Sequence, residues 1–429
     1  MNLYSSSVQP GPNVHNRRAL QWRSPGTLAV ASIALVIGIA GCTGSGSTNA
    51  APTNVLYVST NDPAVGRNAI LAYRRAADGS LAQFSGSPFL TGGTGVTNPT
   101  QLDGPDDDDQ NVIVSADHRF LFAVNGGSNT IAAFQINSDG SLTAAPGSPF
   151  PSGGIEPASL GISGRQLYVV NKDQDPGQVP LAGGTNYVAF RINSNGSLSP
   201  LPGSTVEAPL AASSSQALIS RDGKFLFDAE EGVSALRVFS IGTNGLLTEA
   251  PGSPHTPPSV NGTPASPLGL MTHPTLNLLY SGFVNVNQLA VYSFDPTTGT
   301  PTFLTSVPNT GVEICWLVVT RDGKHLYSAS VGSSTISHYD LTDPRNPVER
   351  QHVAVTNAAS GGTFQLSLDP SERLLYVVQQ RTTTNSADLN GNAIHVFQIA
   401  ADGSVSEAAF SPIALPVPSN AHPQGIVVL

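Results

Sequence analysis

The chain has 429 residues, of which 39% are hydrophobic and 11% charged, and it contains 43 Gly, 34 Pro and 2 Cys. The hydrophobic share is enough for a core, whereas two cysteines exclude a disulfide scaffold and a four-cysteine zinc site. Abundant Gly and Pro without a Gly-X-Y period exclude collagen and favour an all-β protein rich in turns.

The first 41 residues have the composition of an export signal. Three arginines precede an uncharged stretch from Thr27 to Ala40, which is shorter than the ~20 residues of a membrane-spanning helix. Residues 39–42, Ile-Ala-Gly-Cys, resemble the bacterial lipobox, in which the cysteine carries the lipid of the mature protein. We expect residues 1–41 to be a lipoprotein signal peptide, Cys42 the lipidation site and residues 42–53 a flexible tether. An ordinary signal or an uncleaved anchor is the alternative.

This segment predicts an extracytoplasmic protein of the bacterial cell envelope, in the periplasm or on the cell surface. Without the three arginines of residues 1–41, 16 basic residues face 29 acidic ones, a formal net charge of −13. Such a chain lacks the positive surface that nucleic acids or anionic lipids require, so the Cys42 lipid is its expected membrane contact.

From residue 54 onward a repeated pattern predicts the architecture. A Leu-aromatic pair recurs seven times, 46 to 65 residues apart, and each copy precedes a second alternating strand that ends on an aromatic residue. The pairs are Leu56-Tyr57, Leu121-Phe122, Leu167-Tyr168, Leu226-Phe227, Leu279-Tyr280, Leu326-Tyr327 and Leu375-Tyr376. Tight turns such as Asp139-Gly140 follow, and then a proline-rich outer strand such as residues 146–149.

An apolar inner strand precedes most pairs, as at residues 112–115, 216–220 and 317–320. Four strands in each of seven units predict an all-β, seven-bladed β-propeller over residues 54–429, with antiparallel blades. The first unit lacks an inner strand, and the chain ends on a single inner strand from Gln424 to Leu429. This C-terminal strand is expected to complete the N-terminal blade and close the ring.

The repeats Arg119–Asn125 and Ala133–Leu142 resemble those of the lactonase-type seven-bladed propellers, a family that includes 6-phosphogluconolactonases, carboxymuconate cyclase and exported proteins with Tyr-Val-Thr-Asn-like repeats. The resemblance covers roughly residues 54–429 and implies a lactone hydrolase, a carboxylic ester hydrolase. It also implies a histidine before a middle inner strand, with arginine and glutamate nearby. In this chain residues 212–216 read Ala-Ser-Ser-Ser-Gln and residues 266–269 supply no arginine, so a phosphorylated substrate is not expected.

The long connections of the predicted ring lie on one of its two faces. The insertions at residues 90–110, 171–186, 255–266 and 379–392 all join second to third strands or one blade to the next, so we expect a site there. Glu156 and Glu313, each seven residues before the end of an inner strand, and His422 are the candidate catalytic residues, with Asp228, Glu230 and Glu231 on the same face. They are suited to act as general base and electrostatic clamp on a lactone. Solvated loop acids and a surface histidine are the alternative.

Two further features have simpler interpretations. Asp103 and Asp106 to Asp109 form an acidic cluster without the EF-hand pattern, which indicates a solvated loop, with a calcium site as the alternative. Cys315 lies in an apolar run and is expected to be a buried strand residue. The chain lacks phosphate-loop, nucleophile-elbow and metal-binding motifs, so no cofactor or metal is expected.

The sequence leaves two functions open. The first is a monomeric, lipid-anchored enzyme that hydrolyses a lactone or a sugar-acid ester. The second is a non-catalytic propeller that binds a carbohydrate, a peptide or a cell-envelope protein, since fold alone does not decide between them.

Overall fold

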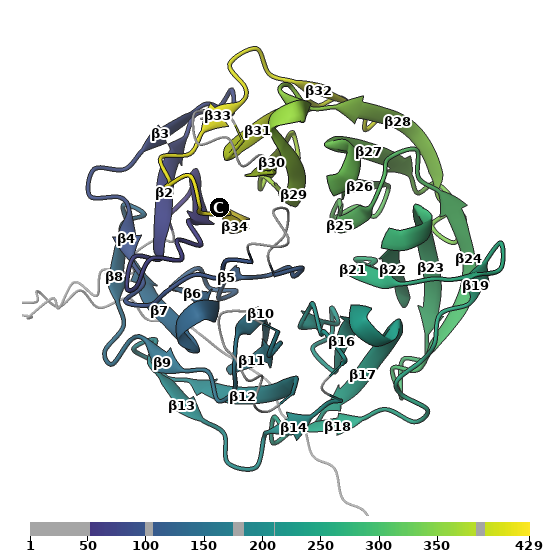
Figure 1. The fold of residues 1–429 in the computed structure, drawn as a ribbon, viewed down its shortest axis with the longest axis horizontal. Helices are drawn as coiled ribbons and strands as arrows, with labels where there is room; N and C mark the ends of the chain where they lie inside the picture. Colours follow the sequence, from purple (N-terminus) through teal and green to yellow (C-terminus); the bar gives the residue numbers. More distant parts are fainter. Residues whose placement is uncertain (1–51, 99–105, 175–183, 210, 383–390) are drawn as a thin grey trace, which may run out of the picture. The chain divides into compact units, whose positions relative to one another are not determined.

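Seven antiparallel sheets are arranged in a ring in the computed structural model, which describes residues 52–98, 106–174, 184–209, 211–382 and 391–429 (Figure 1). The predicted seven-bladed propeller is therefore confirmed. Residues 1–41 and the Cys42 lipidation site lie outside the described residues. None of the short helices in the described residues has the length and hydrophobicity of a membrane span.

Each blade has four strands, which follow one another from the centre of the ring outward. The first four blades are β34 (Gln424–Val428), β1 (Val55–Ser59), β2 (Ala69–Arg75) and β3 (Leu81–Gln83); β5 (Val112–Val114), β6 (Phe120–Asn125), β7 (Thr130–Ile136) and β8 (Leu142–Ala144); β10 (Pro157–Ser163), β11 (Gln166–Asn171), β12 (Asn186–Ile192) and β13 (Leu198–Pro200); and β15 (Leu218–Ile219), β16 (Phe225–Glu230), β17 (Ala235–Ile241) and β18 (Leu247–Glu249).

The remaining three blades follow the same order. They are β21 (Pro267–Thr272), β22 (Leu278–Phe283), β23 (Gln288–Phe294) and β24 (Pro301–Pro308); β25 (Ile314–Val319), β26 (His325–Ser330), β27 (Thr335–Asp340) and β28 (Val348–Ala354); and β29 (Gly361–Leu368), β30 (Leu374–Arg381), β31 (Ala393–Ile399) and β32 (Val405–Glu407). A separate hairpin joins β19 (Ser259–Val260) to β20 (Thr263–Pro264). Five single-turn 3-10 helices are η1 (Gly126–Ser128), η2 (Glu231–Val233), η3 (Val284–Val286), η4 (Val331–Ser333) and η5 (Ala358–Ser360).

The ring closes as the sequence predicts. The C-terminal strand β34 pairs antiparallel with β1, with Leu56 opposite Val428 and Tyr57 opposite Val427. The backbone N–H of Val55 also donates to the carbonyl of Leu429 at 3.0 Å. Both ends of the described chain therefore share the first blade, which removes an open inner edge.

The Leu-aromatic pairs hold neighbouring blades together. Their tyrosine hydroxyls donate to carbonyls in the outer turn of the next blade: Tyr57 to Gly140 at 2.7 Å, Tyr168 to Gly245 at 3.0 Å, Tyr327 to Gly403 at 2.9 Å and Tyr376 to Gly79 at 3.1 Å. All four glycines have positive φ, and a Cβ at Gly140 would lie 2.8 Å from Phe84. The Asp-Gly and Asn-Gly turns are thus needed both for their conformation and for close packing.

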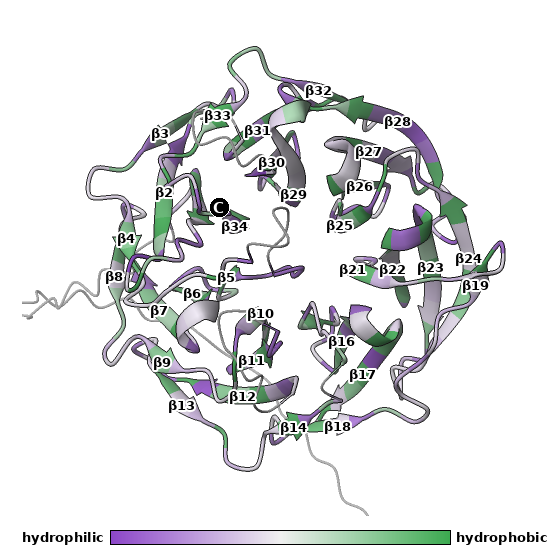
Figure 2. Ribbon diagram, viewed as in Figure 1, coloured by the Kyte–Doolittle hydropathy of each residue, from purple (hydrophilic) through white to green (hydrophobic). Residues whose placement is uncertain are grey.

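The outer strands differ from the prediction in five blades. Residues 146–149 are a turn between β8 and a short strand β9 (Phe150–Pro151), not a strand, and β4 (Phe89–Leu90), β14 (Val206–Glu207) and β33 (Ile413–Ala414) follow similar turns. In each of the five blades a turn serine accepts the third-strand N–H, as Ser148 Oγ does from Ala133 at 2.9 Å. Blades five and six keep unbroken outer strands, and β28 is largely hydrophilic (Figure 2).

Candidate functional site

The inner strands line a central channel with two different ends. Each inner strand begins at the loop face, where the connections between blades and between second and third strands lie, and ends at the turn face, where short turns such as residues 221–224 lead to the second strand. The strands that flank three of the long connections, β4 and β5, β11 and β12, and β30 and β31, end and begin at the loop face, as predicted.

The loop-face half of the channel is filled by residues 106–111, which we call the plug segment. Its backbone accepts hydrogen bonds from Gln365 to Asp108 O at 2.8 Å and from Gln424 to Asp106 O at 3.0 Å. The N–H of Asp109 donates to Ser215 O at 3.1 Å. The plug segment is thus tied to three different blades and occupies the channel at the loop face.

A buried lysine balances the acidic residues of the plug segment. Lys172 Nζ donates to Asp107 O at 2.7 Å and lies 3.8 Å from Asp106 Oδ1, and the side chains of Lys172 and Asp106 are both almost fully buried. Burial lowers the pKa of Lys172, but the surrounding carboxylates outweigh this effect and raise it to about 12. Burial, reinforced by Asp106, raises the pKa of Asp108 well above its usual range.

The expectation of a solvated acidic loop is therefore wrong for Asp106 and Asp108. Asp108 is fully buried and Asp106 nearly so. Within the described residues no group of three or more His, Cys, Asp or Glu side chains is placed to hold a metal ion. Lys172 supplies the positive charge next to these carboxylates instead.

Side-chain amides complete the polar half of the channel. Gln216 makes two bonds to the free edge of the next inner strand, accepting from Leu270 N at 2.7 Å and donating to Leu270 O at 3.1 Å. Ser159 Oγ accepts from Ala217 N at 2.9 Å, and Gln365 accepts from Gly425 N. The inner edges of these strands have no further strand to pair with, so side chains of the preceding blade satisfy them.

The turn-face half of the channel is a hollow cavity of about 390 Å³. Six of the seven blades contribute apolar side chains to its wall: Val114, Leu218, Met271, Val318, Leu366 and Val427. Asp109, Gln110 and Gln216 also line it, beside the plug segment, and His118, Ser115 and Ser367 line it near the short turns. The cavity thus has a polar floor, an apolar wall and a rim at the turn face.

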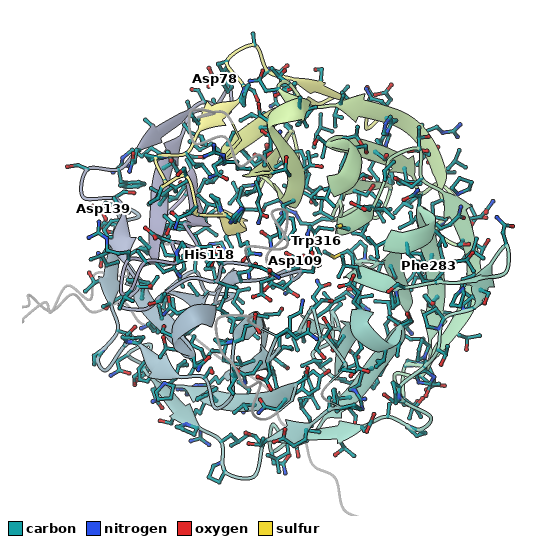
Figure 3. All side chains as sticks on the ribbon, in the orientation of Figure 1. Asp78, Asp109, His118, Asp139, Phe283 and Trp316 are labelled. Carbon is teal, nitrogen blue, oxygen red and sulfur yellow. The ribbon has the colours of Figure 1, made fainter. Side chains whose placement is uncertain are left out.

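Asp109 is the carboxyl group of the cavity floor. It lies near the axis of the ring, as does Trp316, whereas Asp78 and Asp139 lie at the periphery (Figure 3). Burial raises the pKa of Asp109 to about 7, although the Gln110 N–H that donates to its Oδ1 at 2.7 Å acts in the opposite direction. A carboxyl group with a pKa near neutrality in a cavity is suited to proton transfer.

The two predicted glutamates occupy equivalent positions, as expected, but in blades on different sides of the ring. Glu156 and Glu313 have φ of 57° and 59°, and their N–H groups donate to Asn129 Oδ1 at 2.7 Å and Asn287 Oδ1 at 2.8 Å. Glu156 is buried and its carboxylate accepts from the N–H of Gln174, whereas Glu313 is exposed. They precede β10 of the third blade and β25 of the sixth.

His422 precedes β34 of the first blade, so the three predicted residues come from three separate blades. Burial lowers the pKa of His422, and the nearby Arg381 lowers it further. Its Nδ1 has no hydrogen-bond partner among the described residues. Glu156, Glu313 and His422 each have their own neighbours, and none of them lines the central cavity.

Asp228, another of the predicted acids, supports the cavity floor. Asp228 is fully buried, and its Oδ1 accepts from the N–H groups of Ser215 at 3.1 Å and Gln216 at 2.9 Å. Tyr187 donates to Asp228 Oδ2 at 2.5 Å, and burial raises the pKa of Asp228 to about 7. Glu230 pairs with Arg237 instead. Asp228 thus fixes the segment that carries Gln216, at the place where the family resemblance implies a histidine.

Comparison with known proteins agrees with this architecture. Residues 256–379 match the family model described as "Lactonase, 7-bladed beta-propeller". No curated protein matches the sequence. The periplasmic gluconolactonase of Pseudomonas aeruginosa has a TM-score of 0.62 at 18% identity, over 86% of this chain and 98% of that one. A Bacteroides fragilis protein provisionally described as a 6-phosphogluconolactonase has a TM-score of 0.64 at 16% identity, over 89% of this chain and 99% of that one.

A third structure, of a protein from Lactobacillus plantarum, has a TM-score of 0.62 at 18% identity over 87% of this chain and 98% of that one. At these identities the likeness concerns the fold. The chain is thus a seven-bladed β-propeller that closes through its C-terminal strand. The match of residues 256–379 to the lactonase propeller model agrees with the resemblance seen in the repeats.

Proposed function

We propose that this protein is a lactone hydrolase that acts in its central cavity, with Asp109 as the general base. The observation that carries the proposal is a carboxyl group with a pKa of about 7 on the polar floor of an otherwise apolar cavity. The similarity to lactonase-type propellers supports hydrolysis of a cyclic ester as the reaction class.

The cavity floor holds the groups that such a reaction requires. The Asp109 carboxylate takes a proton from a water molecule as the water oxygen attacks the lactone carbonyl carbon. Gln110 Oε1 accepts from Gln216 Nε2 at 3.1 Å, and the amide nitrogen of Gln110 donates no hydrogen bond to any described residue. Gln110 Nε2 is therefore available to donate to the oxyanion. The ring C–O bond then breaks, Asp109 returns the proton to the alkoxide, and a hydroxy acid leaves.

Hydrolysis rates of the full-length protein test this proposal. We expect Asp109→Asn to lower kcat/KM for γ- and δ-lactones by about 10² to 10⁴, and kcat/KM of the unaltered protein to rise with pH through about 7. Asp78→Asn is the matched control, because Asp78 is an exposed turn carboxylate at the periphery (Figure 3). Circular dichroism of each variant checks that it is folded.

The rival interpretations give different results in the same assay. If Asp109→Asn keeps full activity while Glu156→Gln, Glu313→Gln or His422→Ala loses it, the site lies at the loop face. If the unaltered protein hydrolyses no lactone, the enzymatic proposal fails, and the non-catalytic function of binding a carbohydrate, a peptide or an envelope protein takes its place.

We further propose that the protein is exported and anchored in a bacterial membrane through a lipid on Cys42. The basic, apolar and small-residue sequence of residues 1–42 supports this proposal. The name of the Pseudomonas aeruginosa relative in fold, a periplasmic gluconolactonase, agrees with such a location. Cys42→Ser is expected to move the protein from the membrane fraction to the soluble fraction and to remove a lipid-sized mass. Retention in the membrane would contradict lipid anchoring.

A further inference from the structure

The cavity wall is apolar between its polar floor and its rim. The half-buried side chains Val114, Met271, Val318, Leu366 and Val427 all lie near the turn-face ends of their strands. They remain half-buried because the channel in front of them is hollow, whereas the same strands carry Gln365 and Gln424 in the filled half. A ligand in this half therefore meets hydrocarbon on nearly all sides.

Hydrogen-bonding groups occur at the two ends of the cavity. The carboxyl of Asp109 and the amides of Gln110 and Gln216 lie at the floor, Ser115, His118 and Ser367 lie near the rim, and the wall between these ends is apolar. A sugar lactone carries hydroxyl groups around its whole ring, and most of them would lose their hydrogen bonds to water against such a wall. The arrangement fits a ligand with one polar head and an apolar tail.

No lysine or arginine is among the described residues that line the cavity. Three basic side chains of the nearby short turns pair with acids: Lys224 with Asp222 at 2.9 Å, Lys324 with Asp322 at 3.6 Å and Arg321 with Glu372 at 3.0 Å. The ionised form of Asp109 adds a negative charge at the floor. An anionic ligand would thus meet repulsion without a compensating cation.

We infer that the cavity binds a neutral lactone with an alkyl substituent, whose ring reaches Asp109 and Gln110 at the floor and whose alkyl chain lies between the apolar residues of the wall toward the turn face. This inference rests on the proposed function, because it concerns the same cavity and names the class of its substrate. Each methylene group that enters the wall region contributes ~0.8 kcal/mol, which corresponds to about fourfold in Kd.

Binding of alkyl-substituted γ-lactams to the full-length protein tests the inference by calorimetry. A lactam keeps the ring and the carbonyl but resists hydrolysis, so binding is measured without turnover. We expect Kd to fall about fourfold for each added methylene until the cavity is full. A polyhydroxylated sugar lactam and its phosphorylated form are expected to bind at least tenfold more weakly than the best alkyl lactam.

Changes at Met271 on the wall sharpen the test. Met271→Phe narrows the cavity, and the chain length at which affinity stops rising should become shorter. Met271→Ala widens the cavity, and this limit should move to longer chains. Leu304→Ala is the matched control, because Leu304 is exposed on the outer strand β24 and should leave the limit unchanged.

The outcomes separate the ligand class from the reaction. Affinity that does not depend on chain length, or tighter binding of the sugar lactam, would overturn the inference even if sugar lactones are hydrolysed. Chain-length-dependent binding of alkyl lactams without hydrolysis of any lactone would support the ligand class and remove the proposed reaction.

Discussion

The two halves of the central channel are built from the same seven strands but differ in nearly every physical property. The loop-face half is filled by the plug segment, and its polar groups are buried and mutually bonded. The turn-face half is hollow and apolar. The inner strands have backbone N–H and C=O groups at their inner edges that no further strand pairs with. Where the channel is filled, side chains must bond these groups, and where it is open, water can.

The filled half depends on one buried cation, which makes Lys172 the most sensitive position of this comparison. Lys172→Met removes the ammonium group that pairs with Asp106 and donates to Asp107 O, so its positive charge beside these carboxylates is lost. We expect the free energy of unfolding to fall by about 3 to 5 kcal/mol. Urea denaturation at neutral pH measures the change.

Lys224→Met is the matched control for this prediction. Lys224 forms an ion pair with Asp222 at 2.9 Å, but both side chains are exposed, and a change within about 0.5 kcal/mol is expected. Equal effects at the two positions would show that the plug segment is not held by charge.

The free energy of unfolding should depend on pH through Asp109, which lies at the boundary between the two halves. Its pKa is raised to about 7 in the folded protein from an ordinary value near 4, so the folded state binds the proton more tightly than the unfolded state. The stabilisation is therefore complete below about pH 4 and is lost as pH rises through about 7. Access of water to the cavity limits this stabilisation to about 2 to 4 kcal/mol.

Asp109→Asn isolates this effect, because the amide stays neutral at every pH. The unfolding free energy of the variant minus that of the unaltered protein should increase between pH 4 and pH 8, as measured by urea denaturation at several pH values. A constant difference over this range would contradict a raised pKa for Asp109. Asp78→Asn, at the periphery, should show no such increase.

Side-chain amides link the plug segment to the inner strands, and Gln365 makes two of its three hydrogen bonds to this segment. Gln365→Leu leaves Asp108 O, Asn111 Oδ1 and Gly425 N without this partner in a buried place. We expect a loss of about 2 kcal/mol in unfolding free energy, detected as a lower urea midpoint. An unchanged midpoint would contradict the stabilising role of Gln365.

The sequence predicted the ring but only part of the channel, for a physical reason. The blades repeat a local pattern, so Leu56-Tyr57 and its six equivalents, and the unpaired strand from Gln424, were sufficient to infer seven blades and their closure. The contents of the channel come from contacts between distant residues. Lys172 lies 65 residues from Asp107, so nothing local distinguished the plug segment from a solvated acidic loop.

One signal of the polar half was nevertheless present in the sequence. Asn111, Gln216 and Gln365 each stand four residues before the turn residue that ends an inner strand, and all three lie in the filled half of the channel. The equivalence of Glu156 and Glu313 was predicted in the same way and is seen in their shared backbone conformation. Glu156 and Glu313 nevertheless have separate neighbours and do not line the central cavity, so their equivalence alone did not define a site.

The apolar half should tolerate truncation better than the packed space between blades. Met271→Ala removes a side chain that is already half exposed to the cavity, so part of its burial is absent from the start. We expect a loss of about 1 kcal/mol in unfolding free energy. Leu160→Ala is the comparison, because Leu160 is fully buried between the second and third blades, and a loss of about 2 to 5 kcal/mol is expected there. Similar losses at the two positions would mean that side chains from the wall close the cavity in solution and that it does not stand open for a ligand.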